Sequence, residues 1–224
     1  KGGASLPAGC APPAEDAATN AHLVDTTPTV RSDAIVAGGF ALQHGPEGLL
    51  LDQRPIPATK GATLAALAVD AEGRPMVAWA IDDQLMVARR DGETWNSLGN
   101  PGVVNALRGL DLDVLPSGMP VLSWLDAGTV GAPYIRGLGP EGWKDIRPAA
   151  KDQDGLIQCV GHSRSIRSIA TGLDNEQRLV VAWTSWDPKS PSSASACVWD
   201  GLRWAKIPQD LLVERYGLLT DLVP

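Results

Sequence analysis

The most regular feature of the chain is an apolar run that recurs three times and ends each time in a tryptophan. The copies are residues 73–79 (GRPMVAW), 118–124 (GMPVLSW) and 177–183 (QRLVVAW). A second tryptophan follows each copy after a polar turn, and the repeat measures 45 to 61 residues. Short apolar runs bounded by turn residues are typical of strands that are buried on both faces. The pattern therefore predicts a repeat protein built from strands.

Each unit of the repeat predicts four antiparallel strands. In the clearest unit they are residues 63–70, 76–81, 84–89 and 94–98, separated by turn residues such as Asp82-Asp83 and Asp91-Gly92. The two later units give the same order, with predicted strands at 106–113, 120–125, 132–136, 142–147, 165–171, 178–185, 195–199 and 203–207. Residues 149–161 and the Ser/Pro-rich residues 187–194 are expected to be loops.

A degenerate copy precedes these three units. Residues 34–38 align with 75–79, with Gly38 in place of the tryptophan, and residues 45–55 resemble 139–148. We therefore expect four units within residues 23–208. We expect residues 1–22 to be an irregular arm and residues 209–224, in which 211–213 and 218–219 are apolar, to be a closing strand or a docking tail.

Four-stranded units at this period are typical of propeller blades, which bury their faces against one another around an axis. The segment 91–95 (DGETW) resembles the Asp-box (BNR-type) hairpin of bacterial β-propeller repeat proteins, although it is one residue short between the aspartate and the threonine. Lectin-type propellers also carry tryptophans at their blade repeats. The resemblance implies an all-β, propeller-like fold of about four four-stranded antiparallel blades. A β-sandwich is the alternative.

Composition and charge restrict the classes of molecule that the protein is expected to bind. The net charge is −7 and no basic patch is present, which argues against a nucleic-acid partner. No apolar run approaches the roughly 20 residues of a membrane-spanning helix. Gly (24) and Pro (18) are frequent, which favours many turns and short strands over long helices.

Three cysteines allow one disulfide. We predict the pair Cys159–Cys197, because both lie in or beside the last unit, whereas Cys10 lies in the arm. Three reduced cysteines are the alternative. Since the chain begins at Lys1 instead of methionine, we also expect a removed leader and an extracytoplasmic location, periplasmic or secreted.

The tryptophans are the main candidates for ligand contact. Those at the end of the second strand of each unit are expected to pack between sheets. The outer-strand set and two residues without counterparts in other units are candidate ligand-binding residues, with packing as the alternative. The candidates are Trp186, Trp199, Trp95, Trp143 and Trp204.

No catalytic or metal-binding pattern stands out. His22, His44 and His162 are scattered, and we expect no metal and no cofactor. The pair Asp111 and Asp113 lies on one face of a predicted strand, at a spacing that a glycoside hydrolase could use. Solvated aspartates at a strand end are the alternative interpretation of this pair.

We therefore expect a non-enzymatic secreted or periplasmic interaction module, a subunit or scaffold held by protein partners in a larger assembly. Its apolar tail and its small number of units motivate this hypothesis. The alternative is a carbohydrate-binding, lectin-like propeller whose tryptophans stack on glycans. A glycoside hydrolase-like propeller is the third hypothesis, and it rests on Asp111, Asp113 and an analogy at the level of the fold.

Overall fold

A computed structural model describes residues 34–126, 133–146, 166–187 and 190–208 of the chain. These residues form sixteen strands and no helix. In chain order the strands are β1 (Ile35–Ala37), β2 (Phe40–Gly45), β3 (Gly48–Leu51), β4 (Arg54–Pro55), β5 (Ala65–Val69), β6 (Pro75–Ile81), β7 (Gln84–Asp91), β8 (Thr94–Ser97), β9 (Leu107–Val114), β10 (Pro120–Asp126), β11 (Tyr134–Gly139), β12 (Gly142–Asp145), β13 (Ile166–Leu173), β14 (Leu179–Asp187), β15 (Ser190–Trp199) and β16 (Trp204–Ile207).

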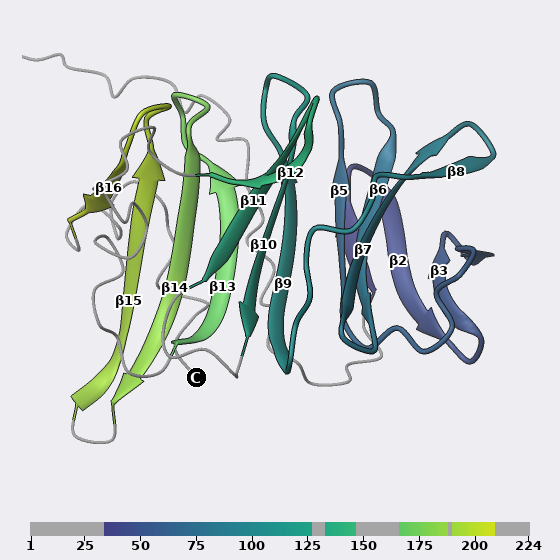
Figure 1. Cartoon of the computed structure of the whole chain (residues 1–224), viewed down its shortest axis with the longest axis horizontal. Helices are drawn as coiled ribbons and strands as arrows, with labels where there is room; N and C mark the ends of the chain where they lie inside the picture. The colour runs from purple at the N-terminus through teal and green to yellow at the C-terminus, as the bar shows by residue number, and fades with distance from the viewer. Residues whose placement is uncertain (1–33, 127–132, 147–165, 188–189, 209–224) are drawn as a thin grey trace, which may run out of the picture.

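The strands form four antiparallel sheets of four strands, and each sheet uses consecutive strands: β1–β4, β5–β8, β9–β12 and β13–β16. The sheets stand face to face in a row, with β1–β4 at one end and β13–β16 at the other (Figure 1). The first strand of each sheet contacts the first strand of the next, from β1 to β5, β9 and β13. This arrangement of blades confirms the prediction of an all-β, propeller-like fold, and four sheets in a row exclude a two-sheet sandwich.

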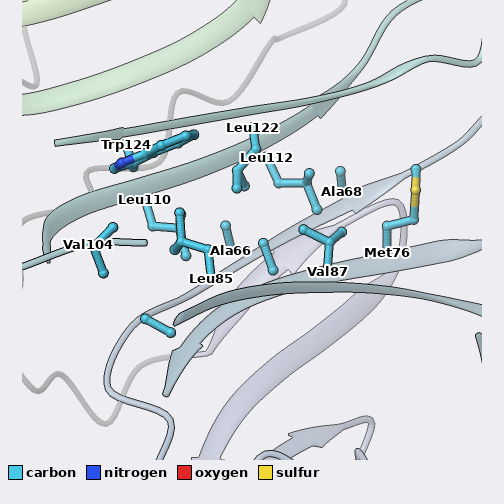
Figure 2. Packing of buried hydrophobic residues seen from close by; sticks show 12 residues of the cluster. Ala66, Ala68, Met76, Leu85, Val87, Val104, Leu110, Leu112, Leu122 and Trp124 are labelled. Atoms are coloured by element: carbon cyan, nitrogen blue, oxygen red, sulfur yellow. The ribbon is translucent and has the colours of Figure 1, made fainter. Parts of the chain in front are cut away.

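Three apolar clusters fill the spaces between consecutive sheets. One joins the first and second sheets, one the second and third, and one the third and fourth. Figure 2 shows the middle cluster, in which residues of β5–β7 face residues of β9 and β10. The central strands β6 and β10 are buried along nearly their whole length because sheets cover both of their faces.

The second-strand tryptophans each pack against the preceding sheet. Trp79 belongs to the cluster between the first two sheets, Trp124 to the middle cluster and Trp183 to the last. They are 4%, 2% and 2% exposed, so the prediction that they pack between sheets is confirmed. Burying an aromatic side chain of this size contributes on the order of 2–3 kcal/mol, and the repeat does so at every interface.

The predicted alignment of the first unit is wrong by one strand. Residues 34–38 were aligned with a second strand, but Ile35–Ala37 is the first strand of its sheet. The turn 45–48 joins the second and third strands, not the third and fourth. The physical reason is the pleat: only this register turns Leu42 and Leu49 toward the second sheet. Gln43 pairs with Leu50 in the first sheet, as Trp79 pairs with Met86 in the second, so Gln43 occupies the position of the tryptophan. Gly38, which was aligned with the tryptophan, lies in a tight turn.

The Ser/Pro-rich segment 187–194 is also not the loop that composition predicted. Strand β14 continues to Asp187 and β15 begins at Ser190, with Ser185 opposite Ser193 and Asp187 opposite Ser190. Backbone pairing with the neighbouring strand outweighs the weak strand preference of these residues. The hairpin consequently extends past the outer strand β16, whose pairing begins at Ala196.

A turn between the first and second strands is built twice in the same way. Asp70 accepts hydrogen bonds from the backbone N–H of Arg74 (2.8 Å) and from its Nε (2.7 Å), and Asp174 receives the same two bonds from Arg178, both of 2.8 Å. Burial alone raises the pKa of each carboxyl, but the bonds from backbone and arginine outweigh it, and both pKa values are lowered. These aspartates therefore fix turns and are not available for acid–base chemistry.

Candidate functional site

The outer tryptophans of the third and fourth sheets connect each sheet to the one before it. The indole N–H of Trp143 donates to the carbonyl of Leu98 (2.8 Å), and that of Trp204 donates to the carbonyl of Ile146 (3.2 Å). Both acceptors follow the outer strand of the preceding sheet. These bonds give Trp143 and Trp204 a packing role, and ligand contact by them stays a prediction.

The other predicted tryptophans are dispersed. Trp95 is half-buried on β8 and packs against the cluster between the first two sheets. Trp199 is half-buried on β15, with its ring tilted against Trp204 at 5.3 Å between centroids. Trp186 lies in β14, and its side chain is outside what the structure describes. The five candidates therefore do not form one site, and their ligand role stays a prediction.

The structure instead brings a different set of polar and aromatic side chains together, on the face of the third sheet toward the second. Tyr134 of β11 is opposite Trp124 of β10, and the two rings stack at 5.0 Å with an interplanar angle of 9°. Trp124 is buried whereas Tyr134 is half-buried, so the stack leads from the core to the surface. The pair forms the aromatic part of the candidate site.

Arg136 lies two residues beyond Tyr134 on the same face of β11. Its guanidinium carbon is 5.7 Å from the centre of the Trp124 ring, and its Nε donates to Asp145 Oδ1 at 2.7 Å. One of its terminal nitrogens donates to the carbonyl of Pro101, at the end of the second sheet. The side chain nevertheless keeps 32% of its surface exposed, and Asp145 keeps 25%. A cation held this way presents fixed donors beside a carboxylate and an aromatic face.

The loop after β8 completes the site from the second sheet. Both backbone polar groups of Gly102 are hydrogen-bonded. Its N–H donates to Asn100 Oδ1 (2.7 Å), and its carbonyl accepts from the N–H of Leu85 (3.1 Å). A Cβ at this glycine would lie 3.3 Å from the Trp124 ring and 3.4 Å from Arg136 Nη1. Glycine therefore lets the loop pass close enough for Pro101 to hold the guanidinium.

One buried donor in the site has no acceptor. Trp124 Nε1 is buried and has no hydrogen-bond partner among the described residues. In Figure 2 the nitrogen end of the ring lies on the side away from Leu122 and Leu112. An unsatisfied buried N–H costs about 1–3 kcal/mol, and a ligand oxygen or a water would remove that cost. Trp79, at the same repeat position, has an unpartnered indole nitrogen as well.

This combination occurs at one of the three described interfaces. The third-strand neighbour of the tryptophan is Tyr134 here, but Met86 beside Trp79 and Ser195 beside Trp183. In the place of the pair Arg136 and Asp145, the second sheet has Ala88 with Ser97, and the fourth has Cys197 with Lys206. The polar side chains are therefore a local addition to a repeated packing site.

The two aspartates predicted as a hydrolase pair lie at the next interface. Asp111 Oδ2 accepts hydrogen bonds from the backbone N–H (2.5 Å) and the hydroxyl (2.8 Å) of Thr171 on β13. Loss of water around the carboxylate, with a smaller contribution from Asp113, raises the pKa of Asp111 to about 6, although Thr171 acts in the opposite direction. Burial also raises the pKa of Asp113. Asp111 thus links two first strands, which is a structural role.

Asp111 should make stability depend on pH. Its pKa is higher in the fold than the unfolded value of 3.8, so between about pH 4 and 6 the folded chain binds more protons than the unfolded chain. The contribution of Asp111 to the free energy of unfolding is therefore complete below that range, and it falls by about 3 kcal/mol as the pH rises through it. Urea unfolding should show a weaker fall for Asp111→Asn, whereas Asp83→Asn, at an exposed carboxyl, should behave like the parent. An Asp111→Asn chain with the parent's pH dependence would contradict this account.

Metal-ligating groups do not gather in the described part of the chain. Within it, no three or more His, Cys, Asp or Glu side chains come together as a metal site would require. His44 is exposed on β2, while His22 and His162 lie outside the described residues. Among the described residues there is also no helix with the length and hydrophobicity of a membrane span.

Sequence reasoning missed Tyr134, Arg136 and Asp145 as a group. The signal was present in the register: once Trp124 is placed in a strand, the alternation in 134–136 puts Tyr134 and Arg136 on the face of the tryptophan. The contribution of Pro101 and Gly102 had no such signal, because it depends on how two sheets meet.

The fold and this site define the class of the protein: an all-β, propeller-like repeat protein with a polar and aromatic cluster at one sheet interface. No protein-family model matches the chain, and no curated protein matches it. The comparison with solved structures does find similar folds.

Three of these structures illustrate the similarity. A variant of Aleuria aurantia lectin in complex with Fucα1-6GlcNAc is 12% identical, with a TM-score of 0.51, over 79% of this chain and 53% of that one. A fucose lectin from Kordia zhangzhouensis in complex with methyl-fucoside is 14% identical, with a TM-score of 0.38, over 64% of this chain and 97% of that one. An endo-1,4-beta-xylanase from Bacteroides thetaiotaomicron is 13% identical, with a TM-score of 0.42, over 75% of this chain and 70% of that one.

At this identity the first comparison shows a shared fold alone. The chain spans about half the length of the Aleuria aurantia lectin.

Proposed function

We propose that the protein binds carbohydrate at the interface of the second and third sheets. The observation that carries the proposal is the guanidinium of Arg136, which belongs to a partly exposed side chain and is held by Asp145 and Pro101 beside the stacked pair Trp124 and Tyr134. The site is thus a different part of the chain from the outer tryptophans that the sequence suggested.

The chemistry of this cluster fits a sugar. Adjacent hydroxyls of a pyranose accept hydrogen bonds from a guanidinium and donate to a carboxylate, and Arg136 and Asp145 provide both groups side by side. The apolar face of the ring matches the half-buried ring of Tyr134. The buried N–H of Trp124 adds one more donor beneath this surface, which a sugar would reach through a water.

The comparison adds support at the level of fold. The chain shares its fold with the Aleuria aurantia lectin, whose structure contains Fucα1-6GlcNAc. A shared fold does not transfer a ligand, so the proposal rests on the residues of this chain. It does make fucosylated glycans a reasonable first set of probes.

Arg136 and Tyr134 should be required for glycan binding. We expect a glycan array that includes Fucα1-6GlcNAc to identify ligands, and titration calorimetry to show at least about tenfold weaker binding for Arg136→Ala and Tyr134→Ala. The reason is the loss of a charge-assisted hydrogen bond or of a stacking face, each worth more than about 1 kcal/mol.

Arg89 provides the matched control. Its side chain is 31% exposed and ion-paired to Asp91, much as Arg136 is 32% exposed and paired to Asp145, but Asp91 is not part of the cluster around Trp124. Arg89→Ala should bind like the parent. An array without ligands, or equal affinity for Arg136→Ala and Arg89→Ala, would overturn the proposal.

The other functional hypotheses stay predictions. A protein partner in a larger assembly finds no specific support in the contacts of a single chain. The hydrolase hypothesis loses its main residue to a structural role, because Asp111 is bonded to Thr171 across the interface.

An extracytoplasmic location is part of the proposal, and the disulfide Cys159–Cys197 is the feature that tests it. Cys197 is completely buried on β15, in the cluster between the third and fourth sheets, whereas Cys159 and Cys10 lie outside the described residues. A bridge closing this loop would stabilise the chain by about 3–4 kcal/mol.

Peptide mass mapping of the native protein should find the peptides of Cys159 and Cys197 linked. Cys159→Ser should lower the midpoint of urea unfolding to the level of the reduced parent, while Cys10→Ser should not change it. Three free thiols in the native protein would exclude the bridge.

A further inference from the structure

The last sheet has a second apolar face in addition to the one that packs on the third sheet. Val180 and Ala182 on β14, Ala196 on β15 and Ile207 on β16 form a separate cluster, with Val198 packed against it. Their neighbours along the strands, such as Val181 and Cys197, belong to the cluster shared with the third sheet. Since side chains alternate between faces, this separate cluster is on the far face of the row. We call it the end face.

Four residues of the end face are buried although no other described sheet reaches it, while Ala205, opposite Val198, is exposed. The exposed fractions are 5% for Val180, 5% for Ala182, 0% for Ala196 and 6% for Ile207. Every residue of the cluster comes from the last sheet itself. Valine and isoleucine on the open face of an outermost sheet would contact water, so these fractions require a cover.

The opposite end of the row differs. On the far face of the first sheet Val36 is 59% exposed, and the place of the tryptophan is taken by Gln43, whose side-chain oxygen accepts a hydrogen bond from Gln53. Val36 is therefore open to water, whereas the cluster on the far face of the last sheet is buried. Among the described sheets, the first thus has an open far face, whereas the apolar cluster on the far face of the last one needs a partner.

We propose that residues 209–224 of the same chain are this partner and lie on the end face. The last described strand, β16, ends at Ile207, a member of the cluster, so the segment starts at the edge of the surface. Seven of its sixteen residues are Leu or Val. Sixteen residues can extend over about 50 Å, far more than the width of one sheet.

The other two long segments are worse placed. Residues 1–33 join β1, in the sheet at the opposite end of the row (Figure 1). Residues 147–165 are constrained at both ends, because they connect β12 of the third sheet to β13 of the fourth. The C-terminal segment thus takes the place that a fifth sheet would occupy, and an additional sheet or a second copy can dock there only by displacing it.

The test is hydrogen–deuterium exchange of the full chain, read by peptide. Val198→Lys places a charge at the end face, and Val36→Lys makes the same change at the solvent-facing end. We expect the peptide covering 209–224 to exchange at least about tenfold faster in Val198→Lys than in the parent, and to be unchanged in Val36→Lys. Val198→Thr keeps the side-chain shape and should give a smaller increase.

The exchange of peptides from β9 and β10 reports on the fold in the same experiment. If Val198→Lys speeds their exchange, the comparison is made with Val198→Thr instead. The proposal is overturned if 209–224 exchanges equally in parent and both Val198 variants, or if the responding peptide is 1–33 or 147–165. It is also overturned if sedimentation equilibrium shows a dimer of the parent that Val198→Lys dissociates, because a second copy would then be the cover.

Discussion

The structure depends on the packing of each sheet against its neighbour through a tryptophan at the end of the second strand. A single four-stranded sheet with two apolar faces is not stable in water, and stacking is what removes those faces from solvent. Trp79, Trp124 and Trp183 perform this task at three interfaces, each nearly fully buried against the preceding sheet. Because the same side chain is used each time, the interfaces differ mainly in what surrounds the indole, and this difference distinguishes the proposed binding site from the two other packing sites.

The surroundings of the tryptophan indole N–H differ between the sheet interfaces. At two interfaces the described structure leaves this donor buried and unpaired. Beside Trp79 the register places Met86 and Ala88, which offer an apolar environment. Beside Trp124 it places Tyr134 and Arg136, and the loop of the preceding sheet adds the carbonyl of Pro101. Two residues on the third strand, Tyr134 and Arg136, and one on the fourth, Asp145, thus give this interface an aromatic face, a cation and a carboxylate, a combination that the other two described interfaces lack at these positions.

The sequence predicted most of the fold because the pattern of buried strands is local. The strands around Trp79, Trp124 and Trp183 were placed to within a few residues. The first unit was misaligned because the resemblance of 45–48 to 139–142 ignores the pleat, and the faces of Leu42 and Leu49 decide the register. The Ser/Pro-rich segment was misassigned because pairing with β14 is a long-range effect. The candidate site was not predicted for a related reason. Arg136 is held in place by Asp145 and Pro101, and Pro101 comes from another sheet. The turn aspartates Asp70 and Asp174, each four residues before an arginine, were a repeated signal that went unused.

The indole N–H of Trp124 offers the most direct measurement of the central claim, since a bound sugar should change its environment. Two-dimensional 1H–15N spectra resolve the indole signals of the eight tryptophans, and single Trp→Phe variants assign them. Titration with a glycan ligand should shift the signal of Trp124 in a saturable way and leave that of Trp79 in place. Equal shifts of both signals, or a shift confined to Trp186, Trp199 or the outer-strand tryptophans, would contradict the account.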